Sequence, residues 1–242
     1  MSAQGHDQDF TESSYRALVQ RAKQRYQFVT FDRAATAGSG VLWRHDIDMS
    51  VHRALALAKI ERDEGVRATY FVHLHSRFYN ALEDAIVDRL RAIVALGHDV
   101  GVHFDSRFVT GSITMADAVA AERATLERAC GSRAVALSFH DPDVTAVSDA
   151  TEVAGLVNAY GRTLRERFEY ASDSNGYWRF TPLSEVLLSA GPRLQVLTHP
   201  EWWVPEPMPP RARVMRAIEG RAAYLAAKYD AAMTDVGRDN IR

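Results

Sequence analysis

The chain has 242 residues, 47% of them hydrophobic and 25% charged, a length that suits one large core and is short for two domains. Its 29 Lys and Arg residues nearly balance its 31 Asp and Glu residues, so the formal net charge is -2. That balance argues against a basic surface for nucleic acid or an anionic membrane, and we expect neither as a partner.

Localisation is predicted from the cysteine count and the N-terminus. Cys130 is the one cysteine, so no disulfide can form within the chain, and we expect a buried apolar residue there. Residues 1–10 are polar and acidic and lack the basic and apolar regions of a signal peptide. No apolar run approaches the ~20 residues that span a bilayer. We therefore expect a cytoplasmic protein with no membrane span.

Helical spacing of apolar residues appears first in an N-terminal extension of about residues 1–30, where Thr11 is a suitable N-cap. Further along the chain, Ser50 is placed to cap a second helix, and Thr114 opens a capping box before another. A C-terminal helix is expected over about residues 210–230.

Short apolar runs alternate with the helices and are predicted to be buried strands. They cover residues 41–43, 68–72, 100–102, 134–139 and 194–197. Repeated strand and helix without a long linker indicates parallel strands joined by crossover helices. We expect an α/β fold that forms a single domain over residues 1–242. Periodicity alone does not decide whether the sheet closes into a barrel.

Titratable side chains follow most of the predicted strands on the C-terminal side. The segments are His45-Asp46-Ile47-Asp48, His73-Leu74-His75, His103-Phe104-Asp105, His140-Asp141-Pro142-Asp143, Ser172-Asp173 and His199. In β/α barrels the active site lies at that face, because its loops bring side chains from several strands together. One such histidine is usually a structural residue, and one such aspartate is usually an N-cap. Recurrence in strand after strand favours a functional cluster, since caps need no histidines.

Three segments also occur in a characteristic order. They are Arg44-His45-Asp46-Ile47-Asp48, Gly65-Val66-Arg67-Ala68-Thr69-Tyr70-Phe71 and Gly97-His98-Asp99-Val100-Gly101-Val102-His103. Together they resemble the opening motifs of the NodB-type polysaccharide deacetylases, a carbohydrate esterase family. Shorter segments around Phe139, Ser172 and Leu197 extend the resemblance over most of residues 41–203. The resemblance implies an irregular β/α barrel of parallel strands with surrounding helices.

The same resemblance implies roles for individual residues. It places a general base on Asp46, metal ligands on Asp48 and His103, and a general acid on His199. The two aspartates are adjacent in most of the family, whereas Ile47 separates them here, so the assignment of base and ligand between them stays open.

Two further departures concern the metal ligands. Arg107 stands where the resembled family has a second metal-binding histidine. The segment that usually carries an arginine before a proline pair reads Phe139-His140-Asp141-Pro142. We therefore expect His140 to replace the missing ligand.

Two imidazoles and one carboxylate leave positions open on a divalent ion, as a catalytic site requires. Zinc is expected, with cobalt, nickel or manganese as alternatives. Non-haem iron oxygenases use a similar ligand set, but with a cosubstrate and a different fold. Asp173 is expected to orient a catalytic group or, in the alternative, to form a turn.

A sugar substrate is suggested by the residues near these motifs, since indole faces stack on sugar rings and an arginine can pair with a phosphate or carboxylate. The expected substrate-binding residues are His73, His75, Trp178, Arg179, Trp202 and Trp203. The alternative is that the tryptophans belong to the core.

The predicted function is a metal-dependent hydrolase that removes an N-acetyl or similar acyl group from a sugar or polysaccharide precursor, such as a nucleotide-linked or lipid-linked sugar. Asp46 would take a proton from the attacking water, and His199 would give one to the departing amine. Two alternatives stay open, a hydrolase of a linear non-sugar amide on the same fold and a non-catalytic sugar-binding or polysaccharide-assembly protein. The sequence does not indicate the oligomeric state.

Overall fold

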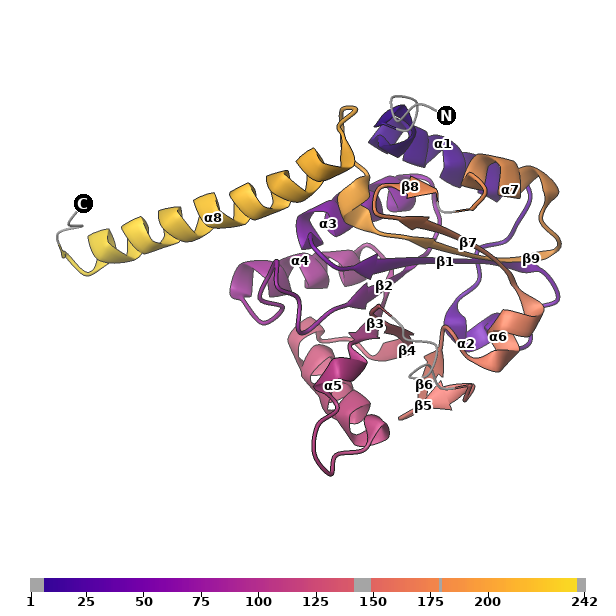
Figure 1. Cartoon of the computed structure of the whole chain (residues 1–242), viewed down its shortest axis with the longest axis horizontal. Coiled ribbons are helices and arrows are strands. Elements are labelled where there is room, and N and C mark those ends of the chain that lie inside the picture. Colours follow the sequence, from indigo (N-terminus) through magenta and orange to yellow (C-terminus); the bar gives the residue numbers. More distant parts are fainter. Residues whose placement is uncertain (1–6, 142–148, 179, 239–242) are drawn as a thin grey trace.

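The computed structural model describes residues 7–141, 149–178 and 180–238, and it is a mixed α/β structure (Figure 1). The strands are β1 (Gly40–Ile47), β2 (Thr69–Val72), β3 (Asp99–Phe104), β4 (Ala134–Phe139), β5 (Glu152–Val153), β6 (Leu156–Asn158), β7 (Glu169–Ser174), β8 (Tyr177–Trp178) and β9 (Arg193–Thr198). The α-helices are α1 (Glu12–Lys23), α2 (Phe31–Ala34), α3 (Val51–Asp63), α4 (Asp84–Ala95), α5 (Met115–Cys130), α6 (Arg162–Arg167), α7 (Leu183–Ser189) and α8 (Pro210–Asp235). Short 3-10 helices cover Asp7–Phe10, Ser106–Phe108 and Pro200–Trp202.

The nine strands form one sheet in the order β5-β6-β4-β3-β2-β1-β9-β7-β8. All neighbours are parallel except the hairpins β5–β6 and β7–β8 at the two ends. The predicted class, parallel strands with surrounding helices, is confirmed. Within the described ranges no strand pairing joins β5 to β8, so the barrel is irregular and open between them.

The helix starts follow the predicted caps. The Thr11 hydroxyl accepts from the backbone N–H of Ser14 at 3.1 Å before α1, and Ser50 accepts from Arg53 at 3.3 Å before α3. Thr114 accepts from Asp117 at 3.1 Å before α5. Each hydroxyl satisfies an N–H that the first helical turn leaves without a partner.

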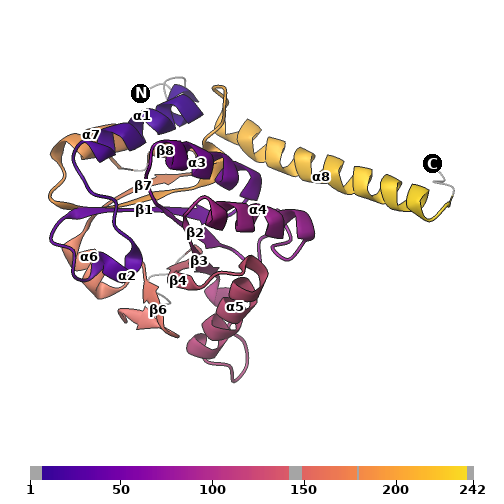
Figure 2. The same ribbon diagram turned by 180° about the vertical axis from the view of Figure 1, so that it is seen from behind.

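Each face of the sheet packs against its own hydrophobic cluster. Helices α7, α1, α3, α4 and α5 form a row in which each contacts the next (Figures 1 and 2), and they cover the outer face. The inner face carries a smaller cluster in which Leu42, Phe71 and Ala136 pack against α2 and α6. Gly101 completes that face, because a Cβ there would lie 2.6 Å from the Phe71 ring.

The strands run further than the apolar runs predicted. His45 and Asp46 lie inside β1, His103 lies inside β3, and Asp173 lies inside β7. These residues continue the hydrogen-bonded ladder while their side chains alternate between the two faces of the sheet. The apolar residues of each run end before the hydrogen bonds between the strands do, and this explains why the predicted strands were too short.

A buried polar network joins α1 and α3 to the sheet. The Glu61 carboxylate contacts the His45 imidazole at 2.7 Å and accepts hydrogen bonds from Tyr15 at 2.5 Å and Tyr70 at 2.6 Å. Burial raises the pKa of Glu61, but His45, His98 and the Tyr15 hydroxyl outweigh it and hold the pKa below its usual value. The buried Glu61 carboxylate is therefore paired with side chains of α1 and of the sheet.

Helix α8 projects away from the rest of the chain (Figures 1 and 2). It runs to Asp235, beyond the predicted end near residue 230, and Arg213 is its one buried residue. None of the helices in the described part of the chain is long and apolar enough to cross a membrane. Cys130 is buried with a free thiol, as predicted, and burial raises its pKa to about 11.

We expect Glu61→Ala to lower the free energy of unfolding by about 3 to 5 kcal/mol, because it removes one partner of a buried, charged network. Denaturant unfolding followed by circular dichroism would measure the change. Glu64→Ala, one turn later beside Arg16 at the protein surface, is the control and should have a much smaller effect. Equal losses for the two variants would contradict the role of the Glu61 network.

Candidate active site

A cavity of about 860 Å³ opens at the C-terminal ends of the parallel strands. Residues from or just after β1, β2, β3, β4, β7 and β9 line it, and these include Asp46, Asp48, His73, His103, His140, Asp173 and His199. The sheet explains this convergence, because Asp46 and Asp48 are two residues apart and side chains alternate along a strand. They continue the inner face that begins with Leu42.

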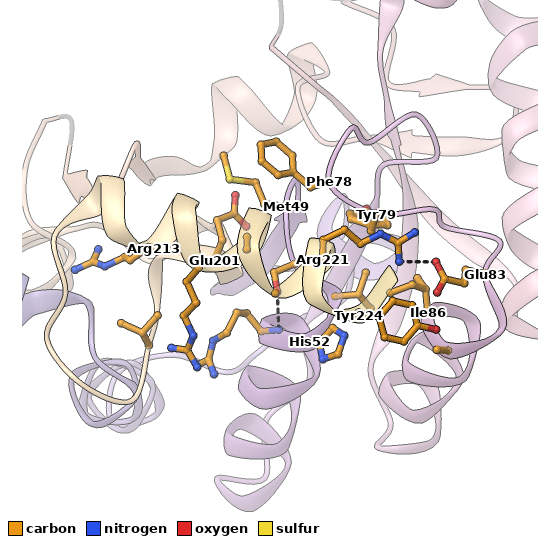
Figure 3. A pocket seen from close by; sticks show the side chains of 18 residues that line it. Met49, His52, Phe78, Tyr79, Glu83, Ile86, Glu201, Arg213, Arg221 and Tyr224 are labelled. Carbon is orange, nitrogen blue, oxygen red and sulfur yellow. Dashed lines mark hydrogen bonds and ion pairs between the residues drawn. The ribbon is translucent and has the colours of Figure 1, made fainter. Parts of the chain in front are cut away.

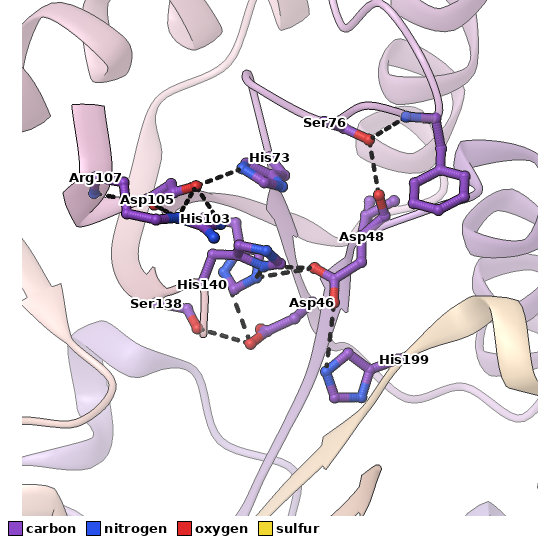
Figure 4. Close-up of polar contacts among 12 residues, drawn as sticks. Asp46, Asp48, His73, Ser76, His103, Asp105, Arg107, Ser138, His140 and His199 are labelled. Atoms are coloured by element: carbon purple, nitrogen blue, oxygen red, sulfur yellow. Dashed lines mark hydrogen bonds and ion pairs between the residues drawn. The ribbon is translucent and has the colours of Figure 1, made fainter. Parts of the chain in front are cut away.

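Three of these side chains point at one another from separate strands (Figure 4). Oδ1 of Asp48 lies 3.0 Å from Nε2 of His103 and 3.2 Å from Nδ1 of His140. The two imidazole nitrogens are 3.3 Å apart. Donor atoms that bind one ion at about 2.0 to 2.2 Å are separated by roughly 3 to 3.5 Å, so the three predicted metal ligands lie at separations that suit a common ion.

The chemistry of this trio also fits a metal. Oδ1 of Asp48 is buried and accepts no hydrogen bond of good geometry, even though both imidazoles are near it. Burial raises the pKa of Asp48, but the contacts with His103 and His140 outweigh it and hold the pKa well below its usual value. The site therefore presents a buried carboxylate oxygen and two nitrogens toward one point, as a divalent ion requires.

His73 was predicted to bind substrate; it lines the large cavity and lies beside the three predicted metal ligands. One donor atom from each of Asp48, His73 and His140 lies within 4.8 Å of the others, and the His73 and His140 rings are tilted by 33° with their centroids 4.3 Å apart. Burial, with His103 and His140 nearby, lowers the pKa of His73 to about 3. His73 is therefore a neutral imidazole beside the three predicted ligands.

Arg107 pairs with Asp105 at the wall of the cavity. Its guanidinium donates to both carboxylate oxygens of Asp105, with distances from 2.7 to 3.1 Å. The residue that stands where the resembled family has a second histidine thus makes an ion pair at the cavity wall. It does not point its charge at the Asp48 carboxylate.

Asp173 supports His199 on the other side of the cavity. Oδ1 of Asp173 lies 2.6 Å from Nδ1 of His199, and both carboxylate oxygens accept from the backbone N–H of that residue. The indole N–H of Trp203 donates to Oδ2 at 3.0 Å. Asp173 is fully buried inside β7, so it orients His199, and the alternative of a turn-forming residue is wrong.

The protonation of His199 follows from these contacts. Burial lowers its pKa, but the carboxylate of Asp173, with contributions from Asp48 and Glu201, outweighs burial and raises the pKa well above its usual value. Nδ1 faces Asp173, while Nε2 lies 3.9 Å from Oδ2 of Asp48. The histidine is therefore held as a proton donor at the edge of the trio.

Asp46 lies below the trio and keeps one oxygen free. Its Oδ2 accepts from the Ser138 hydroxyl at 2.8 Å and lies 3.8 Å from the Arg44 guanidinium, and Arg44 also donates to Ser138 at 3.1 Å. Oδ1 is buried without a hydrogen-bond partner in the described residues. Oδ1 of Asp46 is thus available to accept a proton in the cavity.

Sequence reasoning missed Arg44, Ser138 and Glu201. Arg44 and Ser138 are polar residues within otherwise apolar strand segments, and this interruption was the sequence signal that could have indicated their role. Glu201 follows His199 in a 3-10 turn, and both its carboxyl oxygens are buried without a hydrogen-bond partner. Burial, with Asp48 nearby, raises the pKa of Glu201 well above its usual value.

Glu201 also lines a second cavity of about 300 Å³, which lies between α8 and the helices α3 and α4 (Figure 3). Met49 and Phe78 line both cavities and form part of the wall between them. At the far end, Arg221 of α8 contacts Glu83 at 2.6 Å. The first half of α8 therefore lines a second cavity that shares Met49 and Phe78 with the active-site cavity.

The predicted substrate-binding residues separate in the structure. Trp202 and His75 line the large cavity, and His75 contacts Glu122 at 3.1 Å. Trp178 and Trp203 do not reach it, because they pack in the core around Phe10 at ring distances of 5.4 and 4.8 Å. For these two residues the core alternative is correct. Arg179 lies outside the described residues.

We expect Asp173→Asn to lower the pKa of His199 in the metal-free protein toward the ordinary value of about 6.5, because the substitution removes the negative charge that offsets burial. The His199 ring signals, followed by NMR across the pH range, would measure the shift. Asp99→Asn is a suitable control, since Asp99 pairs with Arg67. An unchanged pKa of His199 in the Asp173 variant would contradict this electrostatic assignment.

No protein-family model and no curated protein sequence matches the chain. Solved structures that it resembles are CE4 proteins, the family 4 carbohydrate esterases. A CE4 family pseudoenzyme from Bacillus anthracis is 14% identical over 78% of this chain and 60% of its own, with a TM-score of 0.42. The chain thus spans about three fifths of that protein's length.

Two further similar structures carry enzyme names. A family 4 acetyl xylan esterase from Clostridium thermocellum, solved in complex with a cobalt ion, is 16% identical over 82% of this chain and 92% of its own, with a TM-score of 0.40. The chitin deacetylase of the fungal pathogen Colletotrichum lindemuthianum is 18% identical over 75% and 81%, with a TM-score of 0.42.

Proposed function

We propose that this chain is a metal-dependent hydrolase that removes an N-acetyl or similar acyl group from a sugar or polysaccharide precursor. One observation carries the proposal. In a single cavity, a three-donor cluster suited to a divalent ion lies between a carboxylate with a free oxygen, Asp46, and a histidine held protonated, His199. Hydrolysis of an amide needs this combination of a proton acceptor, an electrophile and a proton donor.

Asp48, His103 and His140 would hold the ion, for which zinc, cobalt, nickel or manganese is suited. When bound, such an ion polarises an acyl carbonyl and lowers the pKa of water. The protein contributes rigid placement, since Asp48 and His103 come from neighbouring parts of one parallel sheet.

Asp46 is the proposed general base. Ser138 and Arg44 fix its Oδ2, which leaves the unpartnered Oδ1 to take the proton of the attacking water. The Arg44 guanidinium is completely buried and stacks over the Tyr160 ring at 4.6 Å. Because the arginine cannot move without opening the core, it holds the carboxylate in one orientation.

His199 is the proposed general acid. Its Nδ1 is committed to Asp173, so the Nε2 proton is the one that can pass to the departing nitrogen. An amine leaves poorly as an anion, and the raised pKa of His199 favours its protonated, proton-donating form. The Asp173–His199 pair therefore supplies the proton that the departing nitrogen needs once water has attacked the amide.

The cavity also suits a sugar-linked substrate. Its volume of about 860 Å³ lies in the range of small-molecule sites, roughly 300 to 1,000 Å³. Trp202, Tyr160, Tyr170 and Phe180 line it and offer aromatic surface for a sugar ring. The exposed Arg77 at the same wall is positioned to meet a phosphate of a nucleotide-linked or lipid-linked sugar. With one buried cysteine, we propose a reducing, cytoplasmic setting.

Asp46→Asn and His199→Ala should each lower kcat by about 10²- to 10⁴-fold, because each removes one proton-transfer group. The measurement is acetate release from N-acetylated sugars, including nucleotide-linked ones, with the metal content of each protein determined in parallel. His52→Ala, an exposed histidine of α3 outside the large cavity, is the matched control and should keep wild-type activity.

Hydrolysis at the wild-type rate by both metal-loaded variants would contradict the proposed mechanism. Release of acyl groups only from linear, non-sugar amides would support the alternative substrate on the same site. Sugar binding without turnover, unaffected by either substitution, would support the non-catalytic alternative.

A further inference from the structure

We propose that His73 is a fourth ligand of the metal site, so that three imidazoles and one carboxylate hold the ion. This inference rests on the proposed function and extends it, because the number of protein ligands determines which ions keep a coordination position free for substrate. Its support is the strand register, the burial of His73 and the distance from His73 to the other donor atoms.

The register of the sheet places His73 between two of the proposed ligands. Val72 pairs with Ile47 of β1 and with Val102 of β3. One residue further along each strand, Asp48, His73 and His103 come level across three neighbouring parallel strands. Residues that are level in a parallel sheet point to the same face, so Asp48 and His103 converge at 3.0 Å over the strand end that carries His73.

His140 completes the row from the next strand. His103 is level with Ser138 of β4, and His140 lies two residues further, on the same face of that strand. Four consecutive strands in the order β4-β3-β2-β1 therefore each contribute one donor residue to a single point. Without His73, β2 would be the one strand of the four that contributes none.

Within the part of the chain that the structure describes, one ring nitrogen of His73 is buried and unpaired. The residue is 5% exposed, and its Nε2 is buried with no hydrogen-bond partner among the described residues. The nearest carboxylate oxygen, Oδ2 of Asp105, lies 3.9 Å away and accepts from Arg107. A buried polar atom left unpaired is unfavourable, and a metal ion would satisfy it.

The distances allow a shared ion. One donor atom from each of Asp48, His73 and His140 lies within 4.8 Å of the others, while His103 lies within 3.3 Å of both Asp48 and His140. Around an ion with six ligands at about 2.1 Å, neighbouring donors are roughly 3 Å apart and opposite donors roughly 4.2 Å apart. The His73 donor atom, within 4.8 Å of those of Asp48 and His140, is therefore near the range expected of a donor opposite another one.

Four protein ligands change the expected metal. A tetrahedral zinc ion with four protein ligands is closed and structural, whereas an ion that takes five or six ligands keeps positions for water and substrate. The three-histidine, one-carboxylate set therefore favours cobalt, nickel or another first-row ion of higher coordination number.

The test counts the ligand histidines directly in cobalt-substituted protein. Imidazoles bound to Co²⁺ give strongly shifted, exchangeable ring N–H signals in proton NMR, one for each histidine. We expect three such signals in the wild type, two in His73→Gln, and three in the control His75→Gln. His75 is the matched control because it lies two residues further along the same segment and contacts Glu122 instead of the cluster.

Two shifted signals in the wild-type protein, or an unchanged count in His73→Gln, would overturn the inference while leaving the proposed metal site intact. Absence of cobalt uptake by the wild type would instead remove the metal site of the proposed function and this inference with it. The wild-type count decides the question even if the His73 variant does not fold.

Discussion

The convergence of imidazole nitrogens on the Asp48 carboxylate is the interaction on which the rest of the site depends. Burial of its Oδ1 favours the protonated form, yet His103 and His140 lie close enough to hold the pKa of Asp48 well below its usual value. The parallel register of the sheet brings the two imidazoles and the carboxylate from β1, β3 and β4 to separations of 3.0 to 3.3 Å, which suit a common ion.

The protein meets the cost of burying so many polar groups by pairing them in separate layers. Glu61 and His45 pair beneath the sheet, toward α1 and α3. Arg44 and Ser138 hold Asp46 on the inner face, and Asp173 holds His199 across the cavity. Each catalytic candidate thus has one oxygen or nitrogen fixed by a buried partner and another left toward the cavity. The buried partner fixes the orientation of each side chain, and the atom proposed to transfer a proton stays free of that contact.

Much of the fold could be predicted because the helix caps and the apolar runs are local signals. Thr11, Ser50 and Thr114 cap helices as their spacing indicates. The trio of Asp48, His103 and His140 was predicted from the resemblance to the family motifs together with the place of each residue after an apolar run, and the structure brings the three side chains together. Strand ends were placed too early, because the ladder continues through polar residues such as His103, which hydrophobic periodicity cannot detect.

The rest of the site depended on contacts between distant parts of the chain. Trp178 and Trp203 were expected near a sugar, but Phe10 and the Asp173 carboxylate draw them into the core. The role of Arg44 depends on Ser138, which is 94 residues away in the chain. No local pattern could indicate that Val72 would pair with both Ile47 and Val102 and so bring His73 level with the ligands.

The most direct measurement is anomalous diffraction from crystals grown with Co²⁺, recorded at the cobalt edge. The account predicts one strong peak in the large cavity, about 2.0 to 2.2 Å from a carboxylate oxygen of Asp48 and from ring nitrogens of His103 and His140. A cavity without a peak, or a peak from which His140 is turned away, would contradict it.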